Sequence, residues 1–225
     1  MNIGSNRRLP AGDHGVTGVR IFLSAFVDFV LATSSKKATQ VKKSIREQKQ
    51  KQVYNPHEDW RVVRGAIQDY LRNGSAGDEL DRVIERALPE RRARYEAMVH
   101  GFQSVPRRRQ LTWIEPPDLK FTHGVLTVTC KPDLGLLDKG TRTFVKLHYG
   151  ARSPSRERVD VIAQVMRSAM KGSTDTKFGV LDLRRSSMRT PRARADMAYA
   201  IEEQAETFVR YWKDYQSGSS SKDVA

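Results

Sequence analysis

The sequence predicts an α/β protein of the α+β type, because a helical first half precedes a second half that mixes strands with helices. In the first half, apolar residues recur every three or four positions between breaks at Ser34-Ser35, Asn55-Pro56 and Gly77-Asp78. After Pro106, stretches with alternating β-branched residues appear, which is typical of strands. The predicted order from Pro89 onward is therefore helix, three strands, helix, strand and helix.

The first-half helices differ in charge and in the width of their apolar faces. The first, over residues 19–32, places five apolar residues on one face: Phe22, Leu23, Phe26, Phe29 and Val30. The second, between Lys36 and Lys51, has seven Lys or Arg residues and one acid, so we expect it to face solvent or an anionic partner. Three more helices are predicted over residues 57–74, 78–88 and 89–105.

The second half opens with strands predicted over residues 107–117, 124–137 and 141–149. A Ser-capped helix is expected over residues 153–170, and the apolar run 177–185 predicts a buried strand. A last helix over residues 193–215 leads into a Ser/Gly-rich tail. The chain thus divides into a flexible start, a helical N-terminal region, an α/β core and a disordered tail: residues 1–18, 19–88, 89–215 and 216–225.

The charge of the chain predicts the chemical class of its partner. Its 225 residues include 40 Lys and Arg against 26 Asp and Glu, which gives a formal net charge of +14. Such a surface attracts polyanions, of which nucleic acid is the commonest in a cell. The charge does not decide between DNA and RNA, and we rank DNA ahead of RNA. The plainer interpretation is a basic surface that contacts only solvent.

Cysteine use and hydropathy predict the compartment. A single cysteine, Cys130, excludes an internal disulfide and a multi-cysteine zinc site, and it suits a reducing environment. The longest apolar run, from Ile21 to Ala32, contains Asp28 and is too short to span a bilayer. We therefore expect a soluble, cytoplasmic protein with no membrane partner.

A predicted hairpin at residues 131–150 places one acid beside one amine. If Lys139 and Gly140 form a two-residue loop, Asp138 faces Thr141, and counting back pairs Asp133 with Lys146 on one face of the sheet. A carboxylate beside a lysine at a strand end is the minimum for metal-assisted cleavage of a phosphodiester, with Mg²⁺ on the acid. The plainer interpretation is a cross-strand ion pair.

The element order, with Pro132-Asp133 at the second strand of the core and Lys146 in the third, resembles the PD-(D/E)XK nuclease superfamily, in particular its recombination-exonuclease-like branch. The resemblance covers about residues 89–215. It implies a restriction-endonuclease-like core in which Asp133 and Glu96 hold Mg²⁺ or Mn²⁺ and Lys146 positions the attacking water. Gln204 and Phe208 resemble a further motif of that branch, with Phe in place of Tyr.

One position departs from the family pattern: Phe144 stands where the acid of the third strand is expected. Asp160 and Asp182 are candidates for an acid that has migrated, although each has a plainer role as the partner of a nearby Arg. The replacement leaves two alternatives open, a weakly active metal-dependent nuclease and a degenerate site on a fold that only binds, and it favours the second.

Three Arg-rich stretches predict phosphate contacts, since guanidinium groups match phosphate oxygens. The first covers residues 91–94. The candidate nucleic-acid-binding residues come from the other two, which follow Pro106 and the predicted strand 177–185: Arg107, Arg108, Arg109, Arg184, Arg185, Arg189, Arg192 and Arg194.

Two other classes of function remain open at this stage. One is a non-catalytic nucleic-acid-binding module, and the other is a protein-interaction component in which the Phe-rich helix 19–32 docks on a second copy or another protein. The sequence lacks a Gly-Lys-Ser/Thr phosphate loop, a G-x-G-x-x-G fingerprint and a nucleophile elbow, so nucleotide hydrolysis and α/β-hydrolase chemistry have no support.

Overall fold

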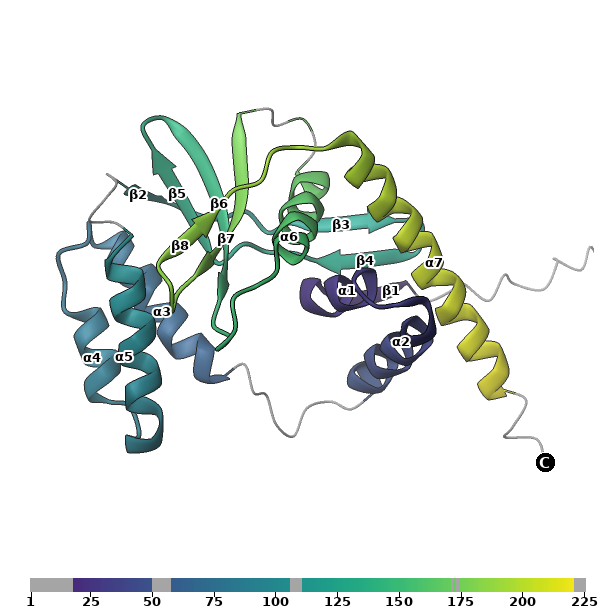
Figure 1. The fold of residues 1–225 in the computed structure, drawn as a ribbon, viewed down its shortest axis with the longest axis horizontal. Helices are drawn as coiled ribbons and strands as arrows, with labels where there is room; N and C mark the ends of the chain where they lie inside the picture. Colours follow the sequence, from purple (N-terminus) through teal and green to yellow (C-terminus); the bar gives the residue numbers. More distant parts are fainter. Residues whose placement is uncertain (1–17, 50–57, 106–110, 171, 173–174, 221–225) are drawn as a thin grey trace, which may run out of the picture.

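The structure is a computed structural model that describes residues 18–49, 58–105, 111–170, 172 and 175–220. It confirms the α+β class, with helices arranged around a five-stranded and a three-stranded sheet (Figure 1). The helices are α1 (Leu23–Val30), α2 (Ser34–Lys49), α3 (Glu58–Arg72), α4 (Glu79–Glu85), α5 (Pro89–Gln103), α6 (Arg156–Ala169) and α7 (Ala195–Ser220). The strands are β1 (Val19–Phe22), β2 (Leu111–Ile114), β3 (Lys120–His123), β4 (Leu126–Thr129), β5 (Leu134–Asp138), β6 (Thr141–His148), β7 (Thr176–Asp182) and β8 (Ser187–Arg189).

The larger sheet has the order β2-β5-β6-β7-β8. Strands β5 and β6 form an antiparallel hairpin that turns at Lys139 and Gly140, whose φ angles are 48° and 82°. Both angles are positive, as a two-residue hairpin turn of the primed type requires, and Gly at the second position adopts such an angle without strain. Helix α6 connects β6 to β7 and returns the chain along the sheet, so these two strands pair in parallel.

Helices α3, α4 and α5 gather on one side of this sheet, on the left in Figure 1. Their apolar stripes, which include Val63, Ile67 and Met98, share one core with the sheet residues Leu134, Leu136, Val145, Leu147 and Leu181. Each fully buried side chain of this kind contributes roughly 1.5–3 kcal/mol by leaving water. This layer therefore holds the hairpin firmly from one face.

Gly101 lets α5 approach the end of β7 at backbone distance. A Cβ atom at this position would lie 1.5 Å from the carbonyl oxygen of Leu183, which no real side chain could do without moving the backbone. The helix therefore depends on glycine here for close approach rather than for an unusual φ angle.

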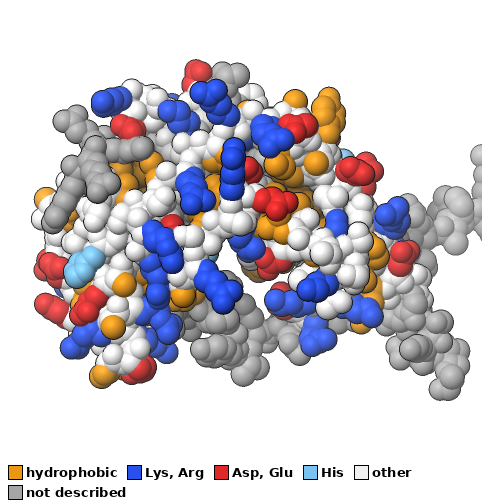
Figure 2. Space-filling view, viewed as in Figure 1, with side chains coloured by type: hydrophobic (Ala, Val, Ile, Leu, Met, Phe, Trp, Pro, Cys, Tyr) orange, Lys and Arg blue, Asp and Glu red, His pale blue; other side chains and the backbone are white. Residues whose placement is uncertain are grey.

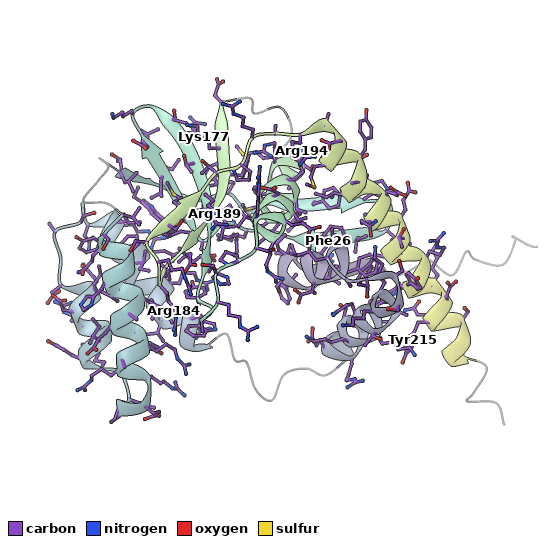
Figure 3. The ribbon with its side chains drawn as sticks, viewed as in Figure 1. Phe26, Lys177, Arg184, Arg189, Arg194 and Tyr215 are labelled. Atoms are coloured by element: carbon purple, nitrogen blue, oxygen red, sulfur yellow. The ribbon has the colours of Figure 1, made fainter. Side chains whose placement is uncertain are left out.

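The opposite side of the sheet packs on α6, and beyond it lie α1, α2, α7 and the smaller sheet (Figure 1). Phe26 and Phe29 of α1 are fully buried and contact Phe208 of α7, with ring centroids 6.5 and 5.0 Å from it. The chain itself covers the apolar face of α1, with Phe26 directed into the molecule (Figure 3). Phe26 and Phe29, which the docking hypothesis would present to a partner, are therefore used inside the fold.

The prediction of one helix over residues 19–32 is wrong at its start. Residues Val19–Phe22 form β1, which pairs in parallel with β4, and the helix begins only at Leu23. As a result Phe22 points outward and is 70% exposed. The helical spacing of Phe22 was misleading because a partner strand about a hundred residues away decides its conformation.

The predicted strand over residues 124–137 is also wrong, because it is divided between two sheets. β4 ends at Thr129 in the smaller sheet, whose order is β1-β4-β3, and β5 begins at Leu134 in the larger one. Pro132 lies between them and has no N–H to donate to a ladder. The sequence analysis also missed β3, which pairs with β4, and the short edge strand β8.

The two ends of the described chain differ from the sequence-based boundaries in small ways. Helix α7 runs to Ser220 and so enters the stretch predicted as a disordered tail. Helix α6 has a Ser cap as predicted, but the cap is Ser155 and not Ser153 at the predicted start of the helix: the Ser155 hydroxyl accepts a hydrogen bond from the Arg158 N–H at 3.1 Å. Across the described ranges, no helix combines the length and hydropathy needed to traverse a bilayer.

Candidate functional site at the ends of strands β5 and β6

The hairpin register brings Asp133 and Lys146 together as predicted. Asp138 pairs with Thr141 and Leu134 with Val145, so the next position along places Asp133 opposite Lys146. The Asp133 N–H continues the ladder by donating to the Val145 carbonyl at 2.8 Å. The Lys146 Nζ atom lies 2.9 Å from each oxygen of the Asp133 carboxylate.

The Asp133 carboxylate is buried and surrounded by donors. Only 4% of the residue is exposed, and besides Lys146 the carboxylate accepts hydrogen bonds from the Leu147 N–H at 2.8 Å and from the Arg64 guanidinium at 3.2 Å. A carboxylate that leaves water needs such partners, because an unpaired buried charge is strongly unfavourable. One acid is therefore neutralised by two cations and a backbone N–H.

Helix α3 reaches this site because β2 is short. β2 pairs with β5 only from Gly135 to Asp138, which leaves the edge of the sheet open beside Asp133. Arg64 and Gln68, one turn apart on α3, approach through this opening, and the Gln68 side-chain amide donates to the Asp133 carbonyl at 2.7 Å. Lys146 also donates to the Lys131 carbonyl at 3.1 Å.

The sequence analysis missed Arg64 and Gln68. The available signal was weak: both residues border the apolar stripe formed by Val63 and Ile67, and polar residues at such positions usually face solvent. Only the packing of α3 on the open sheet edge gives them a role.

An aromatic pair closes the site on the side of α3. The Tyr149 ring stacks on Trp60 at a centroid distance of 5.2 Å, and its hydroxyl is buried without a hydrogen-bond partner in the described part of the chain. Burial raises the pKa of Tyr149 well above its ordinary value, and the nearby negative charge of Asp133 adds to the effect, while Arg64 opposes it. The phenol therefore stays neutral and protonated over the physiological range.

Phe144 belongs to the core. It is 4% exposed and packs against Phe178 of the parallel neighbour β7, with ring centroids 6.0 Å apart. The position at which the family pattern expects an acid is thus an apolar contact between two strands and α6.

Helix α5 carries Glu96, which is half-buried. Arg94, on the same helix, lies over the Trp60 ring at 5.6 Å, so this flank of α5 faces the aromatic pair beside the site. Glu96 is two positions further on, about 200° around the helix axis. The predicted partnership of Glu96 with Asp133 on a metal stays a prediction.

The two other candidate acids have their own partners. Asp182 is buried, accepts a hydrogen bond from the Ser153 hydroxyl at 2.9 Å and pairs with Arg185 at 3.3 Å, which confirms the plainer role predicted for it. Asp160 does not pair with Arg156 in the described structure. Its negative charge instead helps, after the larger contribution of the neighbouring Asp196, to raise the pKa of Arg194.

Gln204 and Phe208 are used to dock α7. Gln204 accepts a hydrogen bond from Lys37 of α2, and Phe208 is fully buried against Phe29 and Trp212. Both residues thus contribute to packing between α7 and the N-terminal helices.

The residues at Asp133 do not fit a bound Mg²⁺ or Mn²⁺ ion. Such an ion prefers about six oxygen ligands, usually including one or two carboxylates. Here the single carboxylate is already engaged by Lys146 and Arg64, whose positive charges would repel a metal ion. The described residues contain no cluster of three or more acidic, His or Cys side chains able to hold one.

The predicted phosphate-binding arginines fall into three groups. Arg107, Arg108 and Arg109 lie outside the described residues. Three others are partly committed to the protein: Arg185 donates to the Ala151 carbonyl, Arg189 to the Pro154 carbonyl, and Arg194 pairs with Asp196. The remaining two are Arg192, which is exposed, and Arg184, whose Nε atom is buried without a partner among the described residues.

Basic side chains are abundant on the face that carries β8. Lys and Arg side chains gather across the middle of this face and around a hollow below it, with some Asp and Glu side chains among them (Figure 2). Arg184, Arg189 and Arg194 follow one another along this face, from the lower end of β7 to the start of α7 (Figure 3).

Comparison with models of known protein families gives no match to this sequence, and comparison with curated proteins gives none either.

Proposed function

We propose that this chain is a nucleic-acid-binding protein with a PD-(D/E)XK nuclease-like core whose catalytic site has become a structural ion cluster. The observation that carries this proposal is the state of Asp133, a buried carboxylate held by Lys146, Arg64 and the Leu147 N–H. A carboxylate in that state stabilises the fold and does not offer its oxygens to a metal ion.

The topology supports the nuclease-like part of the proposal. Helix α5 precedes β2, β5 and β6, helix α6 follows, and β7 then joins the sheet in parallel with β6. This is the element order on which the resemblance rests, with the β3–β4 hairpin as an insertion between the first and second strands of the core. Fold alone does not assign a function, so the chemistry of the site decides between activity and binding.

Charge supports the binding part of the proposal. The chain has a formal net charge of +14. On the face shown in Figure 2, Lys and Arg side chains are spread widely over the surface. Contacts from such side chains to phosphates release counterions, so affinity should fall steeply with salt.

Fluorescence anisotropy with labelled single-stranded and duplex DNA and RNA tests the binding. We expect binding at 50 mM salt that weakens linearly on a log–log plot as salt rises, with DNA bound at least as tightly as RNA. A chain that binds none of these probes at low salt would remove the proposed function.

A weakly active nuclease is the second candidate, because the meeting of Asp133 and Lys146 at one sheet end is the arrangement that the family resemblance implies. Incubation of the protein with the same probes plus Mg²⁺ or Mn²⁺ tests it against an Asp133→Asn variant purified in parallel. We expect equal background cleavage from both. Cleavage by the parent chain that the variant lacks, with the variant shown to be folded by circular dichroism, would favour the enzyme.

A further inference from the structure

Two loops leave the larger sheet side by side at the end that carries Asp133. One is residues 149–155, between β6 and α6, and the other is residues 183–186, between β7 and β8. They are neighbours because β6 and β7 run parallel, with His148 paired to Asp182 at their ends. The Leu183 N–H extends this pairing by donating to the His148 carbonyl at 3.1 Å.

Side-chain hydrogen bonds tie the two loops into one unit. The Ser153 hydroxyl donates to the buried Asp182 carboxylate at 2.9 Å, and the Arg185 guanidinium donates to the Ala151 carbonyl at 2.8 Å. One ring nitrogen of His148, the last residue of β6, lies 2.7 Å from the carbonyl of Arg152 in the first loop. The backbone that carries the neighbouring side chains is thereby held in one shape.

This double loop is strongly basic on its outer side. Arg152 of the first loop and Arg156, the first residue of α6, are exposed, and neither forms an ion pair within the described residues. The second loop adds Arg184 and Arg185. Among the acids near the two loops, Asp133 and Asp182 are buried and already paired, and Glu157 is exposed on the first turn of α6.

We propose that the double loop is the surface that receives the sugar–phosphate backbone of nucleic acid, with Arg152, Arg156 and Arg184 as its phosphate contacts. This inference rests on the proposed function and names the surface that performs it. Guanidinium groups on a pre-ordered backbone lose little conformational freedom when they bind a phosphate. Recognition through phosphates alone carries no base information, so binding at this surface is independent of sequence.

The opposite end of the same sheet provides a matched control. Lys139 and Arg142, at the β5–β6 turn, are exposed cations as Arg152 and Arg156 are. Lys177 at the start of β7 and Arg184 just beyond its end show how far apart the two ends lie in the molecule (Figure 3). A double substitution at either end removes two positive charges. The two variants therefore have the same net charge and differ only in where the charges are lost.

The experiment compares the salt dependence of duplex DNA binding by the parent chain, by Arg152→Gln/Arg156→Gln and by Lys139→Gln/Arg142→Gln. For two lost phosphate contacts, the slope of log affinity against log salt should become shallower by about 1.8, and affinity at 0.1 M salt should fall at least about tenfold. The control variant should keep the parent slope. Thermal unfolding verifies that both variants remain folded, which their exposed positions favour.

The outcomes separate this inference from the proposed function. If the parent binds DNA and the Arg152/Arg156 variant keeps the parent's slope of log affinity against log salt, the double loop is not the binding surface. The proposal of nucleic-acid binding would then still hold. Equal losses in both variants would also overturn the surface, because net charge rather than position would then govern affinity. If the parent binds no nucleic acid, both proposals fail together.

Discussion

Asp133 and Lys146 form a closed ion pair at the end of the β5–β6 hairpin, in which one amine lies 2.9 Å from both oxygens of a buried carboxylate. Arg64 adds a second cation from a helix on the other side of the sheet edge. The contact of Arg64 with Asp133 joins the hairpin to helix α3, so the first consequence of this cluster is for stability.

Replacing Asp133 with Asn should lower the free energy of unfolding by about 3 kcal/mol, because Lys146 and Arg64 would lose their shared counter-charge while staying partly buried. Chemical denaturation measures this change. Asp69→Ala is the control: it breaks an exposed pair with Arg72 and should cost less than about 1 kcal/mol. Similar losses in the two variants would mean that the Asp133 cluster contributes no more than a surface pair.

Introducing an acid at position 144 should fail to create a nuclease. Phe144→Glu would bury a carboxylate against Phe178, so we expect a loss of more than about 4 kcal/mol and little folded protein. Phe144→Leu, which keeps an apolar side chain, should cost about 1.5 kcal/mol or less. Thermal unfolding and assays for Mg²⁺-dependent cleavage check both. A folded Phe144→Glu protein that cleaves DNA would contradict the placement of Phe144 in the core.

Gly101→Ala should destabilise the chain by about 3 kcal/mol, because the new methyl group meets the Leu183 carbonyl and forces α5 away from β7. Gly65 on α3 provides the opposite case. A Cβ atom there has no other atom within 4 Å, so Gly65→Ala should stabilise the helix by about 1 kcal/mol. Denaturation curves of the two variants should therefore shift in opposite directions, and a shift in the same direction would argue against the close approach at Gly101.

The hairpin could be predicted from the sequence because its register depends on local geometry. Lys139-Gly140 fixes the turn, and the positions of Asp133 and Lys146 follow by counting along two adjacent strands. Arg64 could not be predicted in the same way, because it reaches the site through a sheet edge that is open only where β2 stops. The pairing of β1 with β4 is equally non-local, because the pattern of only four residues does not identify a partner strand about a hundred residues away.

The pH dependence of stability should contain a contribution from Tyr149. Its pKa is raised in the folded state by burial, so the folded chain holds the phenolic proton at pH values where the unfolded chain releases it. Stability is unaffected below the ordinary tyrosine pKa of about 10 and falls as pH rises above that value.

Tyr149→Phe tests this contribution. The variant should match or exceed the parent in stability at pH 7, because the hydroxyl it removes is buried without a partner among the described residues. Between pH 8 and 11, its stability in denaturant should decline less than that of the parent. A parallel decline in the two proteins would show that the Tyr149 phenol titrates normally.

The close approach of Gly101 to Leu183 couples the position of α5 to that of the loop 183–186. With no side chain between them, α5 and the end of β7 touch backbone to backbone, and the next residue after Leu183 is Arg184. A displacement of the three-helix layer is therefore passed directly to the turn that carries this arginine.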